Sequence, residues 1–201
     1  MRELEVEDHA PGQSGATDAE SLARRAATRD EAAWARIFDD HFRDIYAFVR
    51  SRLRDPTAAE DLASQVFEVA FSRAETFDYR GLPIQAWLIG IARNLVRDHI
   101  KRAIRRGPEE ELVETVMPAT TGDVAGVELR TDLAAAMRTL TDDQQTVIAL
   151  RFLLDKPVSE TARLMDRSED AVKTLQRRAL AALHRALSAA GYTTAGGGGG
   201  G

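Results

Sequence analysis

The chain has 201 residues, with 27 Lys or Arg against 32 Asp or Glu, so its formal net charge at pH 7 is −5. A hydrophobic content of 44% is enough to bury a core, and the length fits one or two domains. The absence of cysteine excludes disulfide scaffolds, thiolate-bound zinc and thiol nucleophiles. No apolar run approaches the roughly 20 residues that span a bilayer, and the N-terminus lacks the apolar core of a signal peptide. We therefore expect a cytoplasmic protein.

The net charge conceals an alternation of charge along the chain. Residues 1–20 carry six acids and one base, which is typical of a disordered acidic arm. Residues 93–106 carry six bases and one acid, residues 108–128 carry six acids and no base, and residues 163–185 carry six bases and three acids. This distribution predicts two separate basic domains joined by a flexible acidic linker. The hexaglycine run 196–201 cannot contribute to a core and is typical of a fusion linker.

Apolar residues recur at helical spacing and no segment alternates with a period of two, so the fold class is predicted to be all-α. Asp55-Pro56 supplies an N-cap and a first-turn proline for the second helix of the first domain. The helices predicted before the linker cover residues 34–53, 55–74 and 84–105.

The second half of the chain predicts four shorter helices with recognisable caps. Thr141 and Gln144 form a capping box, and Ser159 and Ser168 are predicted N-caps. The predicted helices cover residues 129–140, 141–154, 159–165 and 169–190. Asp166-Arg167-Ser168 is a three-residue turn between the last two, so this pair has the geometry of a helix-turn-helix.

A basic ridge follows one side of the helix 84–105, opposite its apolar side. Its members are spaced four residues apart: Arg93, Arg97, Lys101 and Arg105. Such a ridge repels itself unless it faces a polyanion, so we predict contact with nucleic acid phosphates. The preceding loop, 77–81, adds Tyr79 and Arg80, which are suited to stacking on unpaired bases. The alternative is a solvated basic face whose partner acids lie elsewhere in the chain.

The last predicted helix exposes a polar face at its N-terminal half: Lys173, Thr174, Arg177 and Arg178. In a helix-turn-helix this face would enter the major groove of duplex DNA. The alternative is an ordinary helical hairpin, because basic amphipathic helices are common. Nothing in the sequence predicts catalysis, a metal site or a cofactor: the four histidines are isolated and no glycine-rich phosphate loop precedes the tail.

Several motifs occur in an order that resembles the extracytoplasmic-function (ECF) group of sigma factors of bacterial RNA polymerase. The resemblance covers roughly residues 30–190, and its motifs are Ala59-Glu60-Asp61-Leu62, Phe77-Asp78, the run 86–99 beginning Ala-Trp-Leu-Ile-Gly-Ile-Ala-Arg-Asn, Gln144-Gln145, the run Val147 to Phe152, Ala171-Val172-Lys173 and Arg177-Arg178-Ala179-Leu180. Three positions depart from the usual pattern: Gln65 in place of Glu, Asp166 in place of the turn glycine, and Glu169-Asp170 in place of a small or apolar pair.

The resemblance implies a domain plan and a role for each surface. Residues 1–25 would be the arm, 26–106 the region 2 domain, 107–128 the linker, 129–191 the region 4 helix-turn-helix domain and 192–201 the tail. Core polymerase would bind Asp61, Ser64, Gln65 and Glu68. The melted minus-ten strand would lie against Tyr79, Arg80, Gly81, Gln85, Arg93, Asn94, Arg97 and Lys101. The minus-thirty-five duplex would be read by Lys173, Thr174, Arg177 and Arg178.

The resemblance further implies that the partners are core RNA polymerase, promoter DNA and an anti-sigma factor, and that the chain is not an enzyme. The glycine tail would suit a tether to a fused partner. Two alternatives remain at this point. A stand-alone helix-turn-helix regulator would bind duplex DNA without polymerase, and a structural interaction bundle would bind no DNA.

Overall fold

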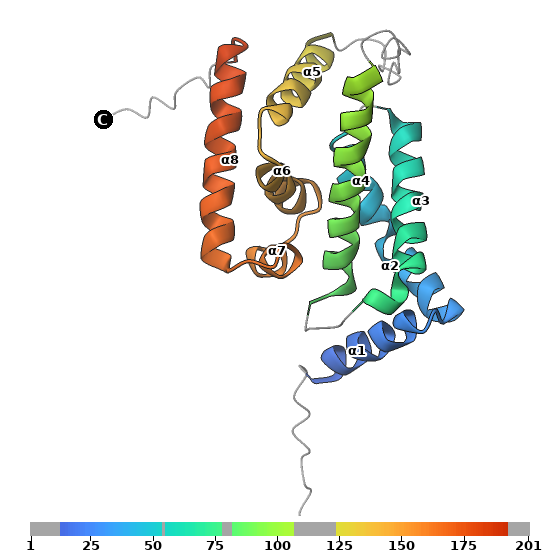
Figure 1. Cartoon of the computed structure of the whole chain (residues 1–201). Helices are drawn as coiled ribbons and strands as arrows, with labels where there is room; N and C mark the ends of the chain where they lie inside the picture. Colours follow the sequence, from blue (N-terminus) through green and yellow to red (C-terminus); the bar gives the residue numbers. More distant parts are fainter. Residues whose placement is uncertain (1–12, 54, 78–81, 107–123, 193–201) are drawn as a thin grey trace, which may run out of the picture.

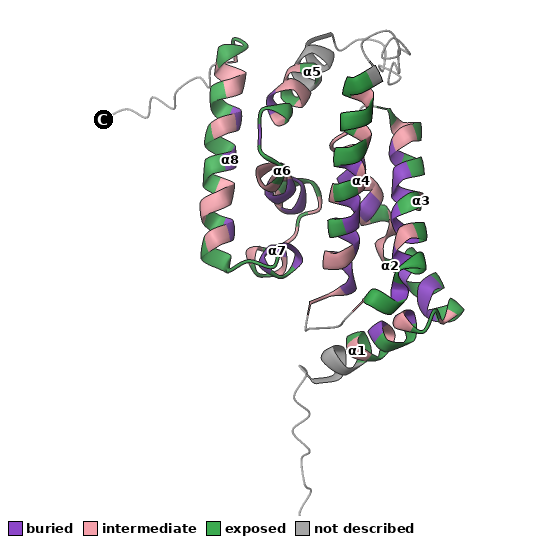
Figure 2. Ribbon diagram, in the orientation of Figure 1, coloured by how far each residue is buried: buried purple, intermediate pink, exposed green. Residues whose placement is uncertain are grey.

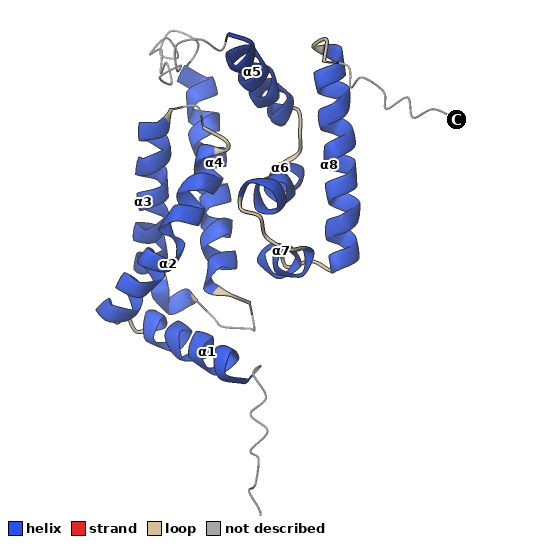
Figure 3. Ribbon diagram, turned by 180° about the vertical axis from the view of Figure 1, so that it is seen from behind, coloured by secondary structure: helices blue, strands red, loops and turns tan. Residues whose placement is uncertain are grey.

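The structure is a computed structural model that describes residues 13–53, 55–77, 82–106 and 124–192. Within these ranges helices are joined by short turns and loops and no strand is present, which confirms the predicted fold class (Figure 1). Helices α1–α4 form an N-terminal domain and helices α5–α8 form a C-terminal domain. Figures 1 and 3 show α6 and α7 lying between α4 of the first domain and α8 of the second.

The N-terminal domain is a bundle in which α2, α3 and α4 contact one another and α1 crosses one end. Asp55 caps α3 by accepting a hydrogen bond from the backbone N–H of Thr57, with Pro56 in the first turn, as predicted. Phe77 and Trp87 stack with ring centroids 4.9 Å apart and pack against the core. The elements are α1 (Gln13–Ala27), α2 (Glu31–Arg50), α3 (Pro56–Ser72), the 3-10 turn η1 (Ala74–Thr76) and α4 (Ile84–Arg106).

The C-terminal domain confirms two of the three predicted caps. Thr141 and Gln144 form the capping box, and the Ser168 hydroxyl accepts a hydrogen bond from the N–H of Ala171. The third is wrong, because α7 begins one residue earlier and Pro157 occupies its N-cap position. The elements are α5 (Val124–Arg138), α6 (Asp142–Ile148), the π-helical turn η3 (Ala149–Leu153), α7 (Val158–Met165) and α8 (Glu169–Ala189).

Two predicted boundaries of disorder are corrected by the structure. The arm was expected to be disordered to residue 25, but α1 is helical from residue 13 because Ala23 and Ala26 are buried against the bundle. The indole Nε1 of Trp34 donates to the Ala26 carbonyl at 3.0 Å, which holds the end of α1 in place. The linker was expected to reach residue 128, but α5 begins at Val124. The rest of the arm and linker lies outside the described residues.

The sequence predicted two separate domains. In the structure the two domains instead share one apolar core. The cluster of buried residues that contains Phe48, Val66 and Leu88 continues into the C-terminal domain through Leu150 and Val172. Figure 2 shows buried positions on α6 and α7 as well as on α2, α3 and α4. A smaller cluster joins α5 to α8. Burial of apolar area across the boundary therefore contributes to the packing of the two domains.

Asp166 adopts the left-handed conformation that its position in the turn requires, with φ of 51°. Aspartate tolerates this conformation less well than glycine because its Cβ approaches the backbone. We expect Asp166→Gly to raise the free energy of unfolding by about 0.5–1 kcal/mol in urea titrations. Asp166→Ala should lower it. A glycine variant no more stable than the parent would contradict the account.

Candidate nucleic-acid and polymerase interfaces

The face predicted to bind core polymerase lies on the outer side of α3. Asp61, Gln65 and Glu68 are exposed and Ser64 is half-buried. On the opposite side of the same helix Leu62, Val66, Phe67 and other apolar residues are buried in the bundle. The amphipathic pattern of α3 thus presents the four polar side chains together, as the sequence predicted.

The outer half of the α4 ridge is open to solvent. Arg97, Lys101 and Arg105 are exposed, and so is Asn94. The Arg97 guanidinium donates from Nη2 to the Asn94 amide oxygen at 2.8 Å, which joins these two predicted strand contacts. In the described part of the chain no acid lies within ion-pairing distance of Arg97 or Lys101. This part of the ridge is available to a polyanion.

Two other side chains that were predicted to contact the melted DNA strand are already bonded to groups of the protein itself. Arg93 donates from Nε to Asp142 and from Nη2 to Asp143, both at 2.7 Å, so the alternative of partner acids elsewhere in the chain holds for this residue. Gln85 is buried and its amide donates to Asp44 at 2.8 Å. Gln85 is thus shielded from solvent, whereas the Arg93 side chain is 30% exposed but already paired with two carboxylates. Tyr79, Arg80 and Gly81 lie outside the described residues.

The helix-turn-helix is present, with α7 packed across the N-terminal half of α8. On the inner side of α8, Val172 and Ala179 are buried. On its outer side Lys173, Arg177 and Arg178 are exposed and Thr174 is half-exposed. Lys173 lies 3.4 Å from Asp170 and 3.9 Å from Glu169 on its own helix. The acidic first turn of α8 therefore partly neutralises one of the predicted base-reading cations.

A buried arginine lies where the two domains meet. The side chain of Arg52, just after α2, is 2% exposed and its guanidinium lies 4.2 Å from the ring centre of Phe48. It donates to the Thr146 hydroxyl of α6 at 2.7 Å and lies 3.4 Å from an Asp142 carboxylate oxygen. Burial lowers the pKa of Arg52 to about 10; the nearby Asp142 carboxylate acts in the opposite direction.

The charged groups around Arg52 form what we call the interdomain ion-pair cluster: Arg52, Arg93, Asp142, Asp143 and Arg167. Arg167 adds an ion pair to Asp143 from the helix-turn-helix turn. Although burial alone would lower the pKa of Arg93, its hydrogen bonds to the two carboxylates produce a net increase. The cluster thus places two carboxylates of the C-terminal domain among three guanidinium groups, two of them from the N-terminal domain.

A second polar connection joins the domains through Asp44 of α2. Its carboxylate accepts the Gln85 amide and also lies 3.1 Å from the Lys156 ammonium, which precedes α7. Lys156 is held in addition by Glu160 at 3.0 Å. Sequence reasoning missed Arg52, Asp44 and Lys156 because they stand alone in the sequence, and it gave no role to the two acids in the first turn of α6.

The described residues offer neither a candidate membrane span nor a candidate metal site. None of the helices there is long and apolar enough to cross a membrane. No group of three or more histidine or acidic side chains in these ranges is placed to hold a metal ion.

Comparison with known proteins follows the same division into two domains. Residues 37–106 match the family model of sigma-70 region 2, and residues 130–183 match that of sigma-70 region 4. The chain is 35% identical over 182 residues to the ECF RNA polymerase sigma factor BldN of Streptomyces coelicolor, which covers 83% of this chain and 64% of BldN. It is 28% identical to the ECF RNA polymerase sigma factor SigX of Bacillus subtilis, covering 77% of this chain and 84% of SigX.

A solved structure has the same overall fold. The sigma factor RpoE of Bartonella quintana, crystallised with the anti-sigma factor NepR, aligns with a TM-score of 0.53 and 22% identity. The alignment covers 77% of this chain and 96% of that chain. At this identity the likeness concerns the fold.

Thr146 offers a test of the buried charge. Its hydroxyl accepts from a nearly inaccessible guanidinium, so Thr146→Val should lower the free energy of unfolding by about 1–3 kcal/mol. Thr161→Val is the matched control: Thr161 is equally buried, but its hydroxyl makes a longer, 3.4 Å bond to the Lys156 carbonyl. It should cost about 1 kcal/mol or less in the same urea titration. Equal decreases would show that the charge of Arg52 adds nothing.

Proposed function

The chain belongs to the ECF sigma factors of bacterial RNA polymerase, and on this basis we propose that it directs core polymerase to promoters and promotes their melting. The observation that carries the proposal is the pairing of a region 2 bundle, with its exposed cations on α4, and a helix-turn-helix in one chain. Each surface alone occurs in many kinds of DNA-binding protein. The two together fit a promoter that has a minus-ten and a minus-thirty-five element. The chain spans 64% of the length of BldN, so we assign these roles to the matched residues.

In this proposal the outer face of α3 binds core polymerase. Arg97, Lys101 and Asn94 hold the phosphates and bases of the melted minus-ten strand, as an exposed basic groove does for single-stranded DNA. Arg177 and Arg178, with Lys173 and Thr174, read the minus-thirty-five duplex in the major groove. The chain supplies binding and no catalytic step, and acts in the cytoplasm with the polymerase.

We extend the proposal to control by an anti-sigma factor. RpoE shares the fold and was crystallised with its anti-sigma factor NepR, and exposed apolar side chains on this chain offer a surface for such a partner. Phe152 and Leu153 on η3 are 56% and 53% exposed. The acidic linker would run into the polymerase, and the tail would tether a fused partner; both lie outside the described residues.

Charge reversal on the exposed ridge tests the minus-ten assignment. We expect Arg97→Glu with Lys101→Glu to abolish promoter-directed initiation, because two attractions to phosphates become repulsions. The measurement is run-off transcription with core polymerase on genomic fragments from the encoding bacterium. Arg102→Glu with Arg138→Glu makes the same charge change at exposed positions off the ridge and should retain activity. Initiation that survives the first change would remove the ridge from strand binding.

Substitution on α8 tests the minus-thirty-five assignment separately. Arg177→Ala with Arg178→Ala should weaken binding to promoter duplex, and the salt dependence should become shallower by about 1 for each phosphate that the variant no longer neutralises. Binding to single-stranded DNA should be unchanged. Tight duplex binding by the parent chain without polymerase would instead support a stand-alone regulator.

A further inference from the structure

The packing of the two domains covers part of the surface that promoter DNA is proposed to use. Arg93, the first cation of the ridge, is held by two carboxylates from the first turn of α6. A carboxylate pair at a helix N-terminus presents negative charge to Arg93 as a DNA phosphate would. An α6 acid and a DNA phosphate therefore compete for one guanidinium.

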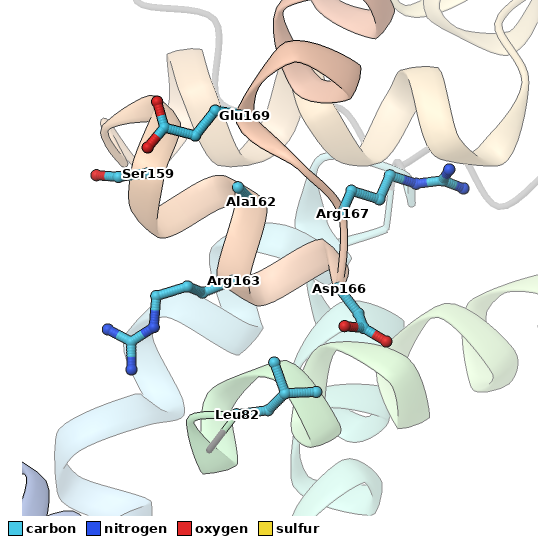
Figure 4. A pocket seen from close by; sticks show the side chains of 7 residues that line it. All are labelled: Leu82, Ser159, Ala162, Arg163, Asp166, Arg167 and Glu169. Atoms are coloured by element: carbon cyan, nitrogen blue, oxygen red, sulfur yellow. The ribbon is translucent and has the colours of Figure 1, made fainter. Parts of the chain in front are cut away.

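The start of α4 is covered in a second way. Gln85 is bonded to Asp44, and Asp44 also binds Lys156 of the C-terminal domain. Figure 4 shows Leu82, which follows the segment 78–81 in the sequence, facing α7 and the helix-turn-helix turn. It lines one hollow with Ala162, Arg163 and Asp166. The C-terminal domain thus lies against the beginning of α4 as well as its first ridge cation.

Geometry separates this arrangement from a promoter-bound one. Two DNA elements named for positions minus ten and minus thirty-five lie about 25 base pairs apart, or roughly 85 Å of duplex. A compact chain of this length has a radius of gyration of about 17 Å. The packed chain cannot reach both elements, so promoter binding requires the domains to part.

One feature of the interface between the domains opposes their packing. The Arg52 guanidinium is buried, yet its Nε and Nη1 donate no hydrogen bond within the described structure. A buried charge that is incompletely bonded opposes burial. The two carboxylates that pair with Arg93 are partly exposed, Asp142 to 45% and Asp143 to 31%. The attraction between these charges therefore weakens as the salt concentration rises. Opposing contributions of this kind allow a packed and an open arrangement to exchange.

From these observations we propose that the interdomain ion-pair cluster is autoinhibitory: Asp142 and Asp143 occupy the DNA-binding surface of α4 and hold the free chain closed. The inhibition of promoter binding rests on the proposed function. The closed arrangement itself is argued from the ion pairs. Because the domains must open before both surfaces can bind, the apparent affinity for DNA is reduced by the fraction of closed molecules.

Energy transfer within the full chain tests the closed arrangement. The chain has no cysteine, so Glu60→Cys on α3 and Ala181→Cys on α8, both exposed, accept a donor and an acceptor dye without competition. We expect Asp142→Asn with Asp143→Asn to lower transfer at low salt to the value that the parent reaches at high salt. The matched control, Asp39→Asn with Asp40→Asn, removes two exposed acids of α2 and should leave transfer unchanged.

Exchanging the signs of one ion pair distinguishes loss of that pair from general destabilisation of α6. Arg93→Glu should lower transfer, and adding Asp143→Arg should restore it, because that pair is rebuilt with its charges reversed while Asp142 stays beside the buried Arg52. Circular dichroism checks that each variant keeps its helix content. Failure of the exchange to restore transfer, or an unchanged transfer in the double Asn variant, would overturn the proposal.

Binding to a fluorescein-labelled thymidine homo-oligonucleotide tests inhibition. We expect the Asp142→Asn, Asp143→Asn chain to bind about tenfold more tightly than the Asp39→Asn, Asp40→Asn chain, whose net charge is the same. The oligonucleotide should also lower transfer in the parent. A variant that opens without any gain in binding would refute autoinhibition. A parent chain that closes and opens as described but never initiates transcription with core polymerase would instead refute the proposed function.

Discussion

The arrangement of this chain depends on one buried arginine. Arg52 follows α2, the first large helix of the N-terminal domain, and its guanidinium lies over the ring of Phe48, next to α6 of the other domain. Its burial requires a hydroxyl and a carboxylate from that domain, Thr146 and Asp142. Once α6 is held there, its first turn lies beside Arg93, and α7 lies beside the start of α4. Arg52 thus fixes where α6 lies on region 2, while the shared apolar core supplies the burial that favours the packing.

That packing divides the basic ridge of α4 in two. Arg93 is neutralised inside the protein, whereas Arg97 and Lys101 remain exposed. The division follows position along one helix, since residues four apart share a face and only the first of them reaches α6. A uniform stripe in the sequence has therefore acquired two environments. In the proposed mechanism its outer part attracts nucleic acid in the closed chain, and its inner part becomes available when α6 withdraws.

The sequence predicted the elements far better than their association. The Thr141–Gln144 box, the Asp55 cap and the Ser168 cap are local signals, and the structure has all three. The α4 ridge and the polar face of α3 follow from helical periodicity. Arg52 and Asp44 carry no such signal, because their partners in the other domain lie 90 or more residues away in sequence. The disorder expected of the N-terminal arm rested on its composition and missed the alanines of α1, whose burial supplies the stabilising contact.

The acids that join the two domains lie outside the charged segments that favoured separate domains in the sequence. Basic segments repel one another, and acids placed between two basic domains offset that repulsion. Asp142 and Asp143 do so at the first turn of α6, where the helix dipole already favours negative charge. The same two carboxylates then face a guanidinium that DNA also attracts. Closure and DNA binding accordingly draw on one electrostatic attraction, so salt weakens both and only a competition between them, at fixed ionic strength, separates their contributions.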